Sequence, residues 1–200
     1  MTTEPATRAP FSRERPGPSG LDRRRQFARR ARIADALATL LCASAAVAVA
    51  LFLSYGGAHQ FGTLADAVTS IGIIAGLIGT DFVLVMVVLA ARIPIIDRSI
   101  GHDRAIALHR ALGKPALYLL IAHGVVLLIG YGMSSGIDPI SEIGPMLALP
   151  DMPLAFVALG LLILVVITSL VALRRRYSHE LWHSVHLLSY LAVAFALPHQ

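Results

Sequence analysis

The chain has 200 residues, of which 56% are hydrophobic and 14% are charged, and its mean hydropathy is +0.71. A soluble domain usually has about 25% charged residues, so this composition excludes an ordinary soluble fold and indicates a membrane protein. The sequence pI is about 10.0, but no nucleic-acid-binding motif accompanies the basic residues, so no nucleic-acid partner is expected. The single cysteine, Cys42, excludes disulfides within the chain and cysteine-ligated clusters.

The first 32 residues are rich in Pro, Arg, Ser and Gly, and nine of them are arginines. Because such a segment cannot bury a core, residues 1–32 are predicted to be a disordered basic cytoplasmic tail. Arg24 and Arg25 are similar to the pair that opens a twin-arginine export signal, but the apolar run that follows is long for the core of a signal peptide. We therefore favour the interpretation that these arginines anchor the first membrane span.

Apolar stretches of transmembrane length follow the tail, each of about 20 residues. They predict an all-α fold, a polytopic transmembrane helical bundle formed by residues 33–200. Gly72, Gly76 and Gly79 in the second stretch have the spacing that allows another helix to pack closely. The five predicted spans, the last of which is the shortest, are residues 33–55, 64–91, 108–131, 152–173 and 181–197.

The 17 Lys and Arg residues fall into three groups: before the first predicted span, between the second span and the early third, and between the fourth and fifth. The other two loops, 56–63 and 132–151, contain no basic residue, and the second of them has three acidic ones. By the positive-inside rule, this distribution predicts a cell-membrane protein whose N-terminus and basic loops face the cytoplasm.

Histidines occur at matched spacing in the third and fifth predicted spans. His109 and His123 are fourteen residues apart, which is about 21 Å along a helix and about 40° short of four full turns, so both rings share a face. His186 and His199 are thirteen residues apart on a span that runs parallel to the third. Since an ionisable residue inside a membrane indicates a functional site, we expect His109 to meet His186, and His123 to meet His199, at the same depths.

Two facing imidazoles in a helical bundle can ligate a haem iron on both axial positions, so the two pairs predict two haems, one above the other. Gly113, four residues after His109, leaves room for a macrocycle, although a kink shared with Pro115 explains it equally well. On an ideal helix His199 would lie about 140° from the face of His186, and we expect Pro198 to re-aim it. The alternative is that these histidines are hydrogen-bonded residues of the helical core.

Several short segments of the sequence match the pattern of a known protein family. They are Arg92-Ile-Pro94, Gly101-His-Asp-Arg104, His109-Arg-Ala-Leu-Gly113, His123-Gly124 and Leu181-Trp-His-Ser-Val-His186-Leu-Leu-Ser-Tyr190. Through these segments, residues 92–200 resemble the ferric reductase-like transmembrane domain shared by ferric reductases and NADPH oxidases. The resemblance implies that His109, His123, His186 and His199 are the axial ligands of two b-type haems. Arg110 adjoins His109, and we expect it to pair with a haem propionate.

In that family, electrons pass from cytoplasmic NAD(P)H through FAD to an inner haem, then to an outer haem and to an acceptor outside. The chain departs from the family pattern, because no sixth helix follows Gln200 and no dinucleotide-binding fingerprint occurs. We expect the chain to be the N-terminal part of a longer reductase; a short haem subunit served by a separate flavoprotein is the alternative. FAD and NAD(P)H are expected on the missing domain or partner. The electron acceptor outside is expected to be ferric iron, oxygen or quinone.

A competing motif, His179-Glu180-Leu181-Trp182-His183, matches the H-E-x-x-H signature of zinc proteases. An alternative function is therefore that of a membrane zinc metalloprotease. This alternative leaves the spacing of the other histidines unexplained, and no obvious third ligand follows the motif. A third possibility is a structural membrane subunit without a cofactor.

Overall fold

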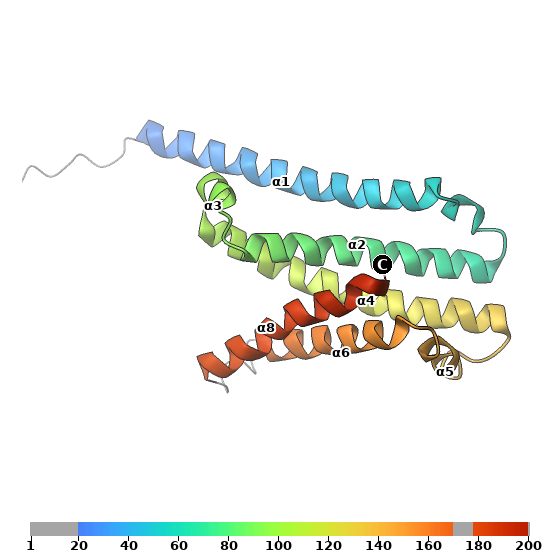
Figure 1. The fold of residues 1–200 in the computed structure, drawn as a ribbon. Helices are drawn as coiled ribbons and strands as arrows, with labels where there is room; N and C mark the ends of the chain where they lie inside the picture. The colour runs from blue at the N-terminus through green and yellow to red at the C-terminus, as the bar shows by residue number, and fades with distance from the viewer. Residues whose placement is uncertain (1–19, 170–177, 200) are drawn as a thin grey trace, which may run out of the picture.

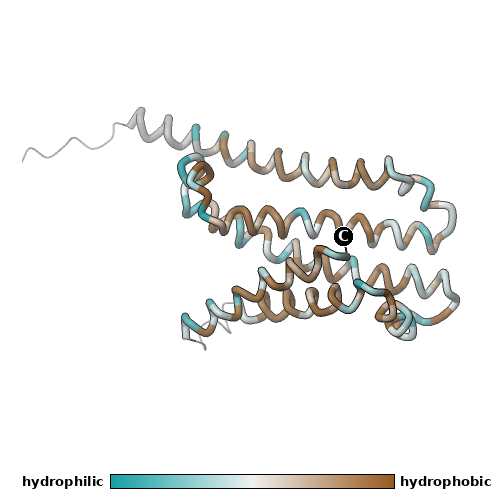
Figure 2. The backbone as a smooth tube through the Cα atoms, viewed as in Figure 1, coloured by the Kyte–Doolittle hydropathy of each residue, from teal (hydrophilic) through white to brown (hydrophobic). Residues whose placement is uncertain are grey.

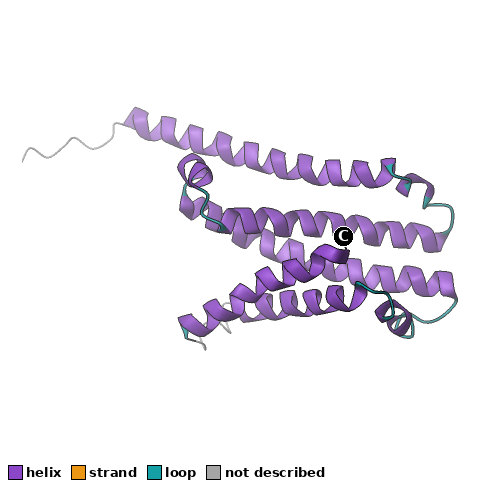
Figure 3. Ribbon diagram, in the orientation of Figure 1, coloured by secondary structure: helices purple, strands orange, loops and turns teal. Residues whose placement is uncertain are grey.

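A computed structural model describes residues 20–169 and 178–199 of the chain as an arrangement of helices (Figure 1). Within these residues no strand occurs, and loops are short (Figure 3). The prediction of an all-α helical bundle is confirmed. The elements are α1 (Gly20–Ser54), η1 (Gly57–His59), α2 (Leu64–Ala90), α3 (Pro94–Ile100), α4 (His102–Ser135), α5 (Ile143–Leu147), α6 (Met152–Ser169), α8 (His179–Ala196) and η2 (Leu197–His199).

Four of the described helices are long and apolar enough to cross a membrane: Ala31–Ser54 within α1, and the whole of α2, α4 and α6. Apolar residues fill the middle of these helices, and hydrophilic residues gather at their ends and in the loops (Figure 2). The protein is therefore a multi-pass membrane protein. Helix α4 is longer than its predicted span at both ends, and the last residues of the fourth predicted span, 170–173, lie outside the described residues.

The fifth predicted span, residues 181–197, corresponds to α8 and the first residue of η2. Helix α8 has 18 residues but is not one of the four helices that meet the length and hydropathy required of a span. The physical reason is that His179, Glu180 and His183 make its first turns polar. Ser178 caps this end of α8, because its hydroxyl oxygen accepts a hydrogen bond from the backbone N–H of Leu181.

The predicted disordered tail is helical in part. Residues 20–32 form the first turns of α1, and residues 1–19 lie outside the described residues. Residues 20–32 contain no proline, and arginine, the commonest residue among them, favours the helical conformation. The helix that crosses the membrane therefore continues back through the arginines.

Helices α2 and α4 are antiparallel and pack closely along their length. Gly72, Gly76 and Gly79 of α2 are buried against α4, as the small-residue spacing predicted. A Cβ atom at Gly72 would lie only 3.0 Å from Cδ2 of Leu127, and one at Gly79 would lie 3.0 Å from Cδ2 of Leu120. The glycines are therefore what allows the two backbones to come together.

Helix α6 lies on the side of α4 away from α2 and packs against α8, which is inclined to α2 and α4 (Figure 1). Helix α8 begins at the same end of the bundle as α4 and runs in the same general direction, so that its C-terminal end lies beside α2 and α4. This arrangement agrees with the expectation that the third and fifth predicted spans run parallel.

Helix α1 lies along α2 and is exposed over most of its length. A side-chain hydrogen bond joins the two helices: the hydroxyl of Ser44 donates to Oδ1 of Asp81, with an Oγ–Oδ1 distance of 2.6 Å. Asp81 is a carboxyl group within a membrane-spanning helix, a kind of residue that is costly there and is usually retained for a purpose. The sequence analysis did not single out Asp81.

We predict that Ser44→Ala lowers the free energy of unfolding by about 1 kcal/mol, because it removes the hydroxyl that joins α1 to α2. The measurement is reversible unfolding of each variant in mixed micelles. Ser54→Ala is the matched control, since the Ser54 hydroxyl donates only to the carbonyl of Leu51 in its own helix. Equal losses for the two variants would show that the bond to Asp81 does not hold α1 in place.

Candidate functional site

The structure brings together His109 of α4 and His186 of α8. Their ring centroids are 6.0 Å apart, and the ring planes make an angle of 62°. Both side chains are half-buried. Two imidazoles bound to opposite sides of one metal ion, with metal–nitrogen bonds of about 2 Å each, have ring centres roughly 6 Å apart. The separation of His109 and His186 therefore fits an iron between them.

The Nδ1 atoms of both rings have partners on other helices. Nδ1 of His109 is 3.1 Å from the main-chain oxygen of Met86, and Nδ1 of His186 is 3.4 Å from Oγ of Ser169. Because a carbonyl oxygen can only accept a hydrogen bond, Nδ1 of His109 must carry the hydrogen, which leaves Nε2 with its lone pair free. Metal-ligating histidines usually have this arrangement, with the second nitrogen donating to a carbonyl.

His123, the second predicted ligand on α4, has the same kind of support. Its Nδ1 atom is 2.8 Å from the main-chain oxygen of Gly72. A Cβ atom at Gly76 would overlap the His123 ring. Since a helical Cβ points back over the preceding turn, the absence of one at residue 76 uncovers the Gly72 carbonyl and makes room for the imidazole. Gly76 thus positions a side chain as well as allowing the helices to pack.

The two histidines of α4 use matching positions on α2. His109 and His123 are fourteen residues apart, and so are their carbonyl partners, Met86 and Gly72. In a closely packed antiparallel pair, each step along one helix is matched by a step back along the other. One register therefore sets the tautomer of both histidines.

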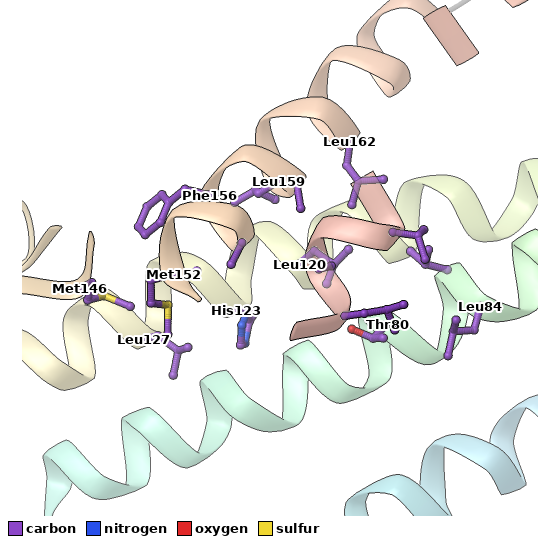
Figure 4. A pocket seen from close by; sticks show the side chains of 17 residues that line it. Thr80, Leu84, Leu120, His123, Leu127, Met146, Met152, Phe156, Leu159 and Leu162 are labelled. Atoms are coloured by element: carbon purple, nitrogen blue, oxygen red, sulfur yellow. The ribbon is translucent and has the colours of Figure 1, made fainter. Parts of the chain in front are cut away.

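His123 lines a cavity between the helices, as Figure 4 shows. The empty space of this cavity is about 900 Å³ when the part that is open to the surroundings is counted. Leucine, methionine and phenylalanine side chains from α2, α4, α5 and α6 line it, and so do Val193, Ala196 and Leu197 at the end of α8. His123 is the only imidazole in this described lining.

His199, its predicted partner, lies in the turn η2, and its side chain is outside the described residues. The backbone changes from α-helix to 3₁₀-helix at Leu197, next to Pro198. Leu197, two residues before His199, lines the same cavity as His123. The re-aiming of His199 by Pro198 stays a prediction.

Arg110 and Arg104, the two arginines nearest to His109 in the sequence, lie in different surroundings. Arg110 is exposed. Arg104 lines a different cavity of about 650 Å³, together with Leu37 of α1 and Ile100 of α3. A Cβ atom at Gly113 would make an ordinary van der Waals contact with Cε of Met86, at 3.9 Å. Helix α4 continues through Pro115.

The H-E-x-x-H segment forms the first turns of α8. Glu180 and His183 are exposed, and the side chain of His179 lies outside the described residues. Among the described side chains, no group of three or more His, Cys, Asp or Glu residues could hold a metal ion. Trp182 stacks on His186, with ring centroids 5.2 Å apart and planes inclined by 23°. The sequence analysis missed this contact, although residues four apart on a helix share a face.

The sequence matches the family described as "Ferric reductase like transmembrane component" over residues 75–197. The chain belongs to this family. The matched region begins within α2 and includes α4, α6 and α8, so it contains His109, His123 and His186 and ends just before His199. No curated protein and no solved structure shows a significant match to the chain. Family membership supports a transmembrane, ferric reductase-like role and oxidoreductase activity in general.

We predict that Gly76→Ala displaces the His123 imidazole from the Gly72 carbonyl, because the added methyl group overlaps the ring. The overpacking should cost about 1–3 kcal/mol of stability. The measurement is ¹⁵N NMR of histidine side chains in the apoprotein, where the Nδ1–H tautomer of His123 should lose population. Gly160→Ala in α6 is the control, since a Cβ atom there would meet nothing within 4 Å. An unchanged His123 tautomer in Gly76→Ala would contradict the proposed role of this glycine.

Proposed function

We propose that this bundle holds two b-type haems and transfers electrons through them across the cell membrane. His109 and His186 would ligate the inner haem, and His123 and His199 the outer one. The observation that carries the proposal is the closeness of His109 and His186. The two residues come from separate helices, and their ring centroids are 6.0 Å apart. A cofactor-free helix pair has no need to hold two partly buried imidazoles at the separation of axial ligands.

The environment of the inner pair supports this assignment. Each ring has its Nδ1 atom beside an oxygen of another helix, so Nε2 is the nitrogen available to iron. Gly113 lies on the face of α4 that carries His109, and a Cβ atom there would touch only Cε of Met86. The chain thus offers a pair of ligands and a hydrogen-bond partner for each of them.

The outer assignment is supported by His123, whose Nδ1 donates to Gly72 and whose ring borders an apolar cavity. The same cavity is bounded by the end of α8, the element that leads into His199. Low polarity around the cavity would exclude water and favour a buried cofactor.

The haems, when bound, would supply the one-electron redox chemistry. The residues of the chain would orient the ligating imidazoles, direct Nε2 towards the iron and set the spacing of the two sites. That spacing is the fourteen-residue step from His109 to His123, about 21 Å along α4. The carbonyls of Met86 and Gly72 would also hold the orientation of these two ligands.

We infer the direction of transfer from the charges. Every Lys and Arg lies in the N-terminal segment, in a loop predicted to be cytoplasmic or near the start of the third predicted span, so the end of α4 near His109 would face the cytoplasm. Electrons would come from NAD(P)H through an FAD-containing domain or partner, since these 200 residues contain no dinucleotide-binding fingerprint. They would leave to an acceptor outside, such as ferric iron or oxygen. Outward transfer of one electron gains about 2.3 kcal/mol per 100 mV of inside-negative potential.

We predict that the purified protein binds two low-spin b-type haems and that each ligand variant removes one of them. His109→Ala or His186→Ala should remove the inner haem, because either change vacates an axial position. His123→Ala or His199→Ala should remove the outer haem. The measurements are the pyridine haemochrome assay and a redox titration of each variant.

Glu180→Gln is the control for these ligand variants, because Glu180 is exposed and belongs only to the H-E-x-x-H motif. It should leave both haems in place. A colourless wild-type protein that contains zinc would overturn the proposal, and so would the loss of both haems in Glu180→Gln.

We also predict that the purified chain does not oxidise NADPH or NADH at a useful rate, although dithionite reduces its haems. The reason is that the sequence contains no dinucleotide-binding fingerprint. The measurement is NADPH consumption with and without an added flavoprotein reductase. Rapid NADPH oxidation by the chain alone would show that the electron donor has been misassigned.

A further inference from the structure

The three described histidines of the proposed haem sites are held in different ways. His109 and His123 each donate to a main-chain carbonyl of α2, at 3.1 Å and 2.8 Å. A carbonyl within a helix is fixed, so it fixes the plane of the ring that donates to it. Nδ1 of His186 has the hydroxyl of Ser169 as its partner, at 3.4 Å. A hydroxyl can rotate and this contact is long, so the hydrogen bond alone holds the His186 ring weakly.

A second contact acts on the same ring. The indole of Trp182, one turn earlier on α8, lies nearly parallel to the His186 imidazole, with an interplanar angle of 23° and a centroid distance of 5.2 Å. Offset stacking of this kind restricts rotation of the smaller ring about its Cβ–Cγ bond. His109 lies on another helix, and its ring is inclined by 62° to that of His186. Trp182 therefore holds the His186 plane well away from parallel to that of His109.

We propose that Trp182 is a positioning residue of the inner haem site, which fixes the plane of the His186 imidazole by stacking on it. This inference rests on the proposed function of the His109–His186 pair. Trp182 does not touch the iron; it acts through His186. Its effect would be to keep the two axial ligand planes inclined to each other, and this inclination governs the splitting of the iron d orbitals.

The inclination of the ligand planes can be observed directly. A ferric haem whose two axial imidazoles are far from parallel gives a highly anisotropic low-spin EPR spectrum with a large maximal g value. Parallel imidazoles give a more rhombic spectrum with a smaller one. We expect the highly anisotropic spectrum, with a large maximal g value, from the inner haem. Trp182→Leu, which keeps an apolar side chain but removes the flat surface, should lower and broaden the maximal g value of that haem.

The same substitution should weaken retention of the inner haem. Outer-shell partners of metal-ligating histidines commonly change metal affinity by about 10–100-fold. We therefore expect Trp182→Leu to lose the inner haem to apomyoglobin roughly tenfold faster than the wild type, with the outer haem unchanged. Trp182→Phe retains a flat aromatic ring at the same position and should behave like the wild type in both measurements.

A different role for Trp182 is that of an anchor at the membrane interface, where tryptophan is common. An anchor would act on the whole helix, so Trp182→Leu would reduce expression and the occupancy of both haems together without changing the g value of the haem that remains. Leu181→Ala is the matched control, because Leu181 is an exposed neighbour on the same turn. It should leave the EPR spectrum and the haem loss rates as in the wild type.

The outcomes separate this inference from the proposed function. If the wild type contains no haem, the proposed function is wrong and the inference is overturned with it. If the wild type contains both haems but Trp182→Leu leaves the inner g value and the rate of haem loss unchanged, only the positioning role is wrong. The positioning role is established if Trp182→Leu changes the maximal g value and the loss rate of the inner haem alone. Trp182→Phe and Leu181→Ala should show neither change.

The protein offers a second, independent measurement, because Trp182 is its only tryptophan. An indole stacked on a haem ligand transfers its excitation energy to that haem efficiently. Tryptophan emission should therefore be strongly quenched in the holoprotein and should increase in His109→Ala, in which the inner haem is lost. Strong emission from a wild-type protein that contains both haems would place Trp182 away from the inner site and overturn the inference.

Discussion

The close antiparallel contact between α2 and α4 is the constraint on which the proposed sites depend. Helices in a membrane gain little from burying apolar surface against each other, so their association depends on close packing and on interhelical hydrogen bonds. This contact has both, because glycines remove the Cβ atoms of α2 from the interface and two imidazoles of α4 donate to main-chain carbonyls of α2. The bonds that hold the helices in register are also the bonds that set the tautomers of His109 and His123.

The two helices of this contact have different roles in the proposed sites. Helix α4 carries one ligand of each proposed pair, and α2 fixes the orientation of both. The second ligand of the inner pair, His186, comes from the separate unit of α6 and α8, where a stacked indole and a serine hydroxyl replace the fixed carbonyl. The two axial ligands of one iron would thus have unequal support, one from a rigid helix backbone and one from side chains.

Much of this organisation can be predicted from the sequence, for reasons that lie in the chain itself. The apolar stretches give four helices that can cross a membrane, and the fourteen-residue spacing in α4 places two rings on one face. The small-residue spacing of Gly72, Gly76 and Gly79 predicts close packing without reference to any partner. The start of α1 was predicted less well, because proline, glycine and arginine in one segment suggested a disordered tail although the prolines end before residue 20.

The sequence by itself determined the class of protein, four helices able to span a membrane and the histidines that could serve as ligands, because composition and helical periodicity are local properties. Only the tertiary structure decided which atoms those histidines meet. That Gly76 clears space for His123, that Met86 and Gly72 supply matching carbonyls, and that Ser44 reaches Asp81 all depend on the register between helices. Register is set by the packing of whole helix surfaces, and no single residue carries it. For this reason the ring separation of His109 and His186 could be measured only once the helices were placed.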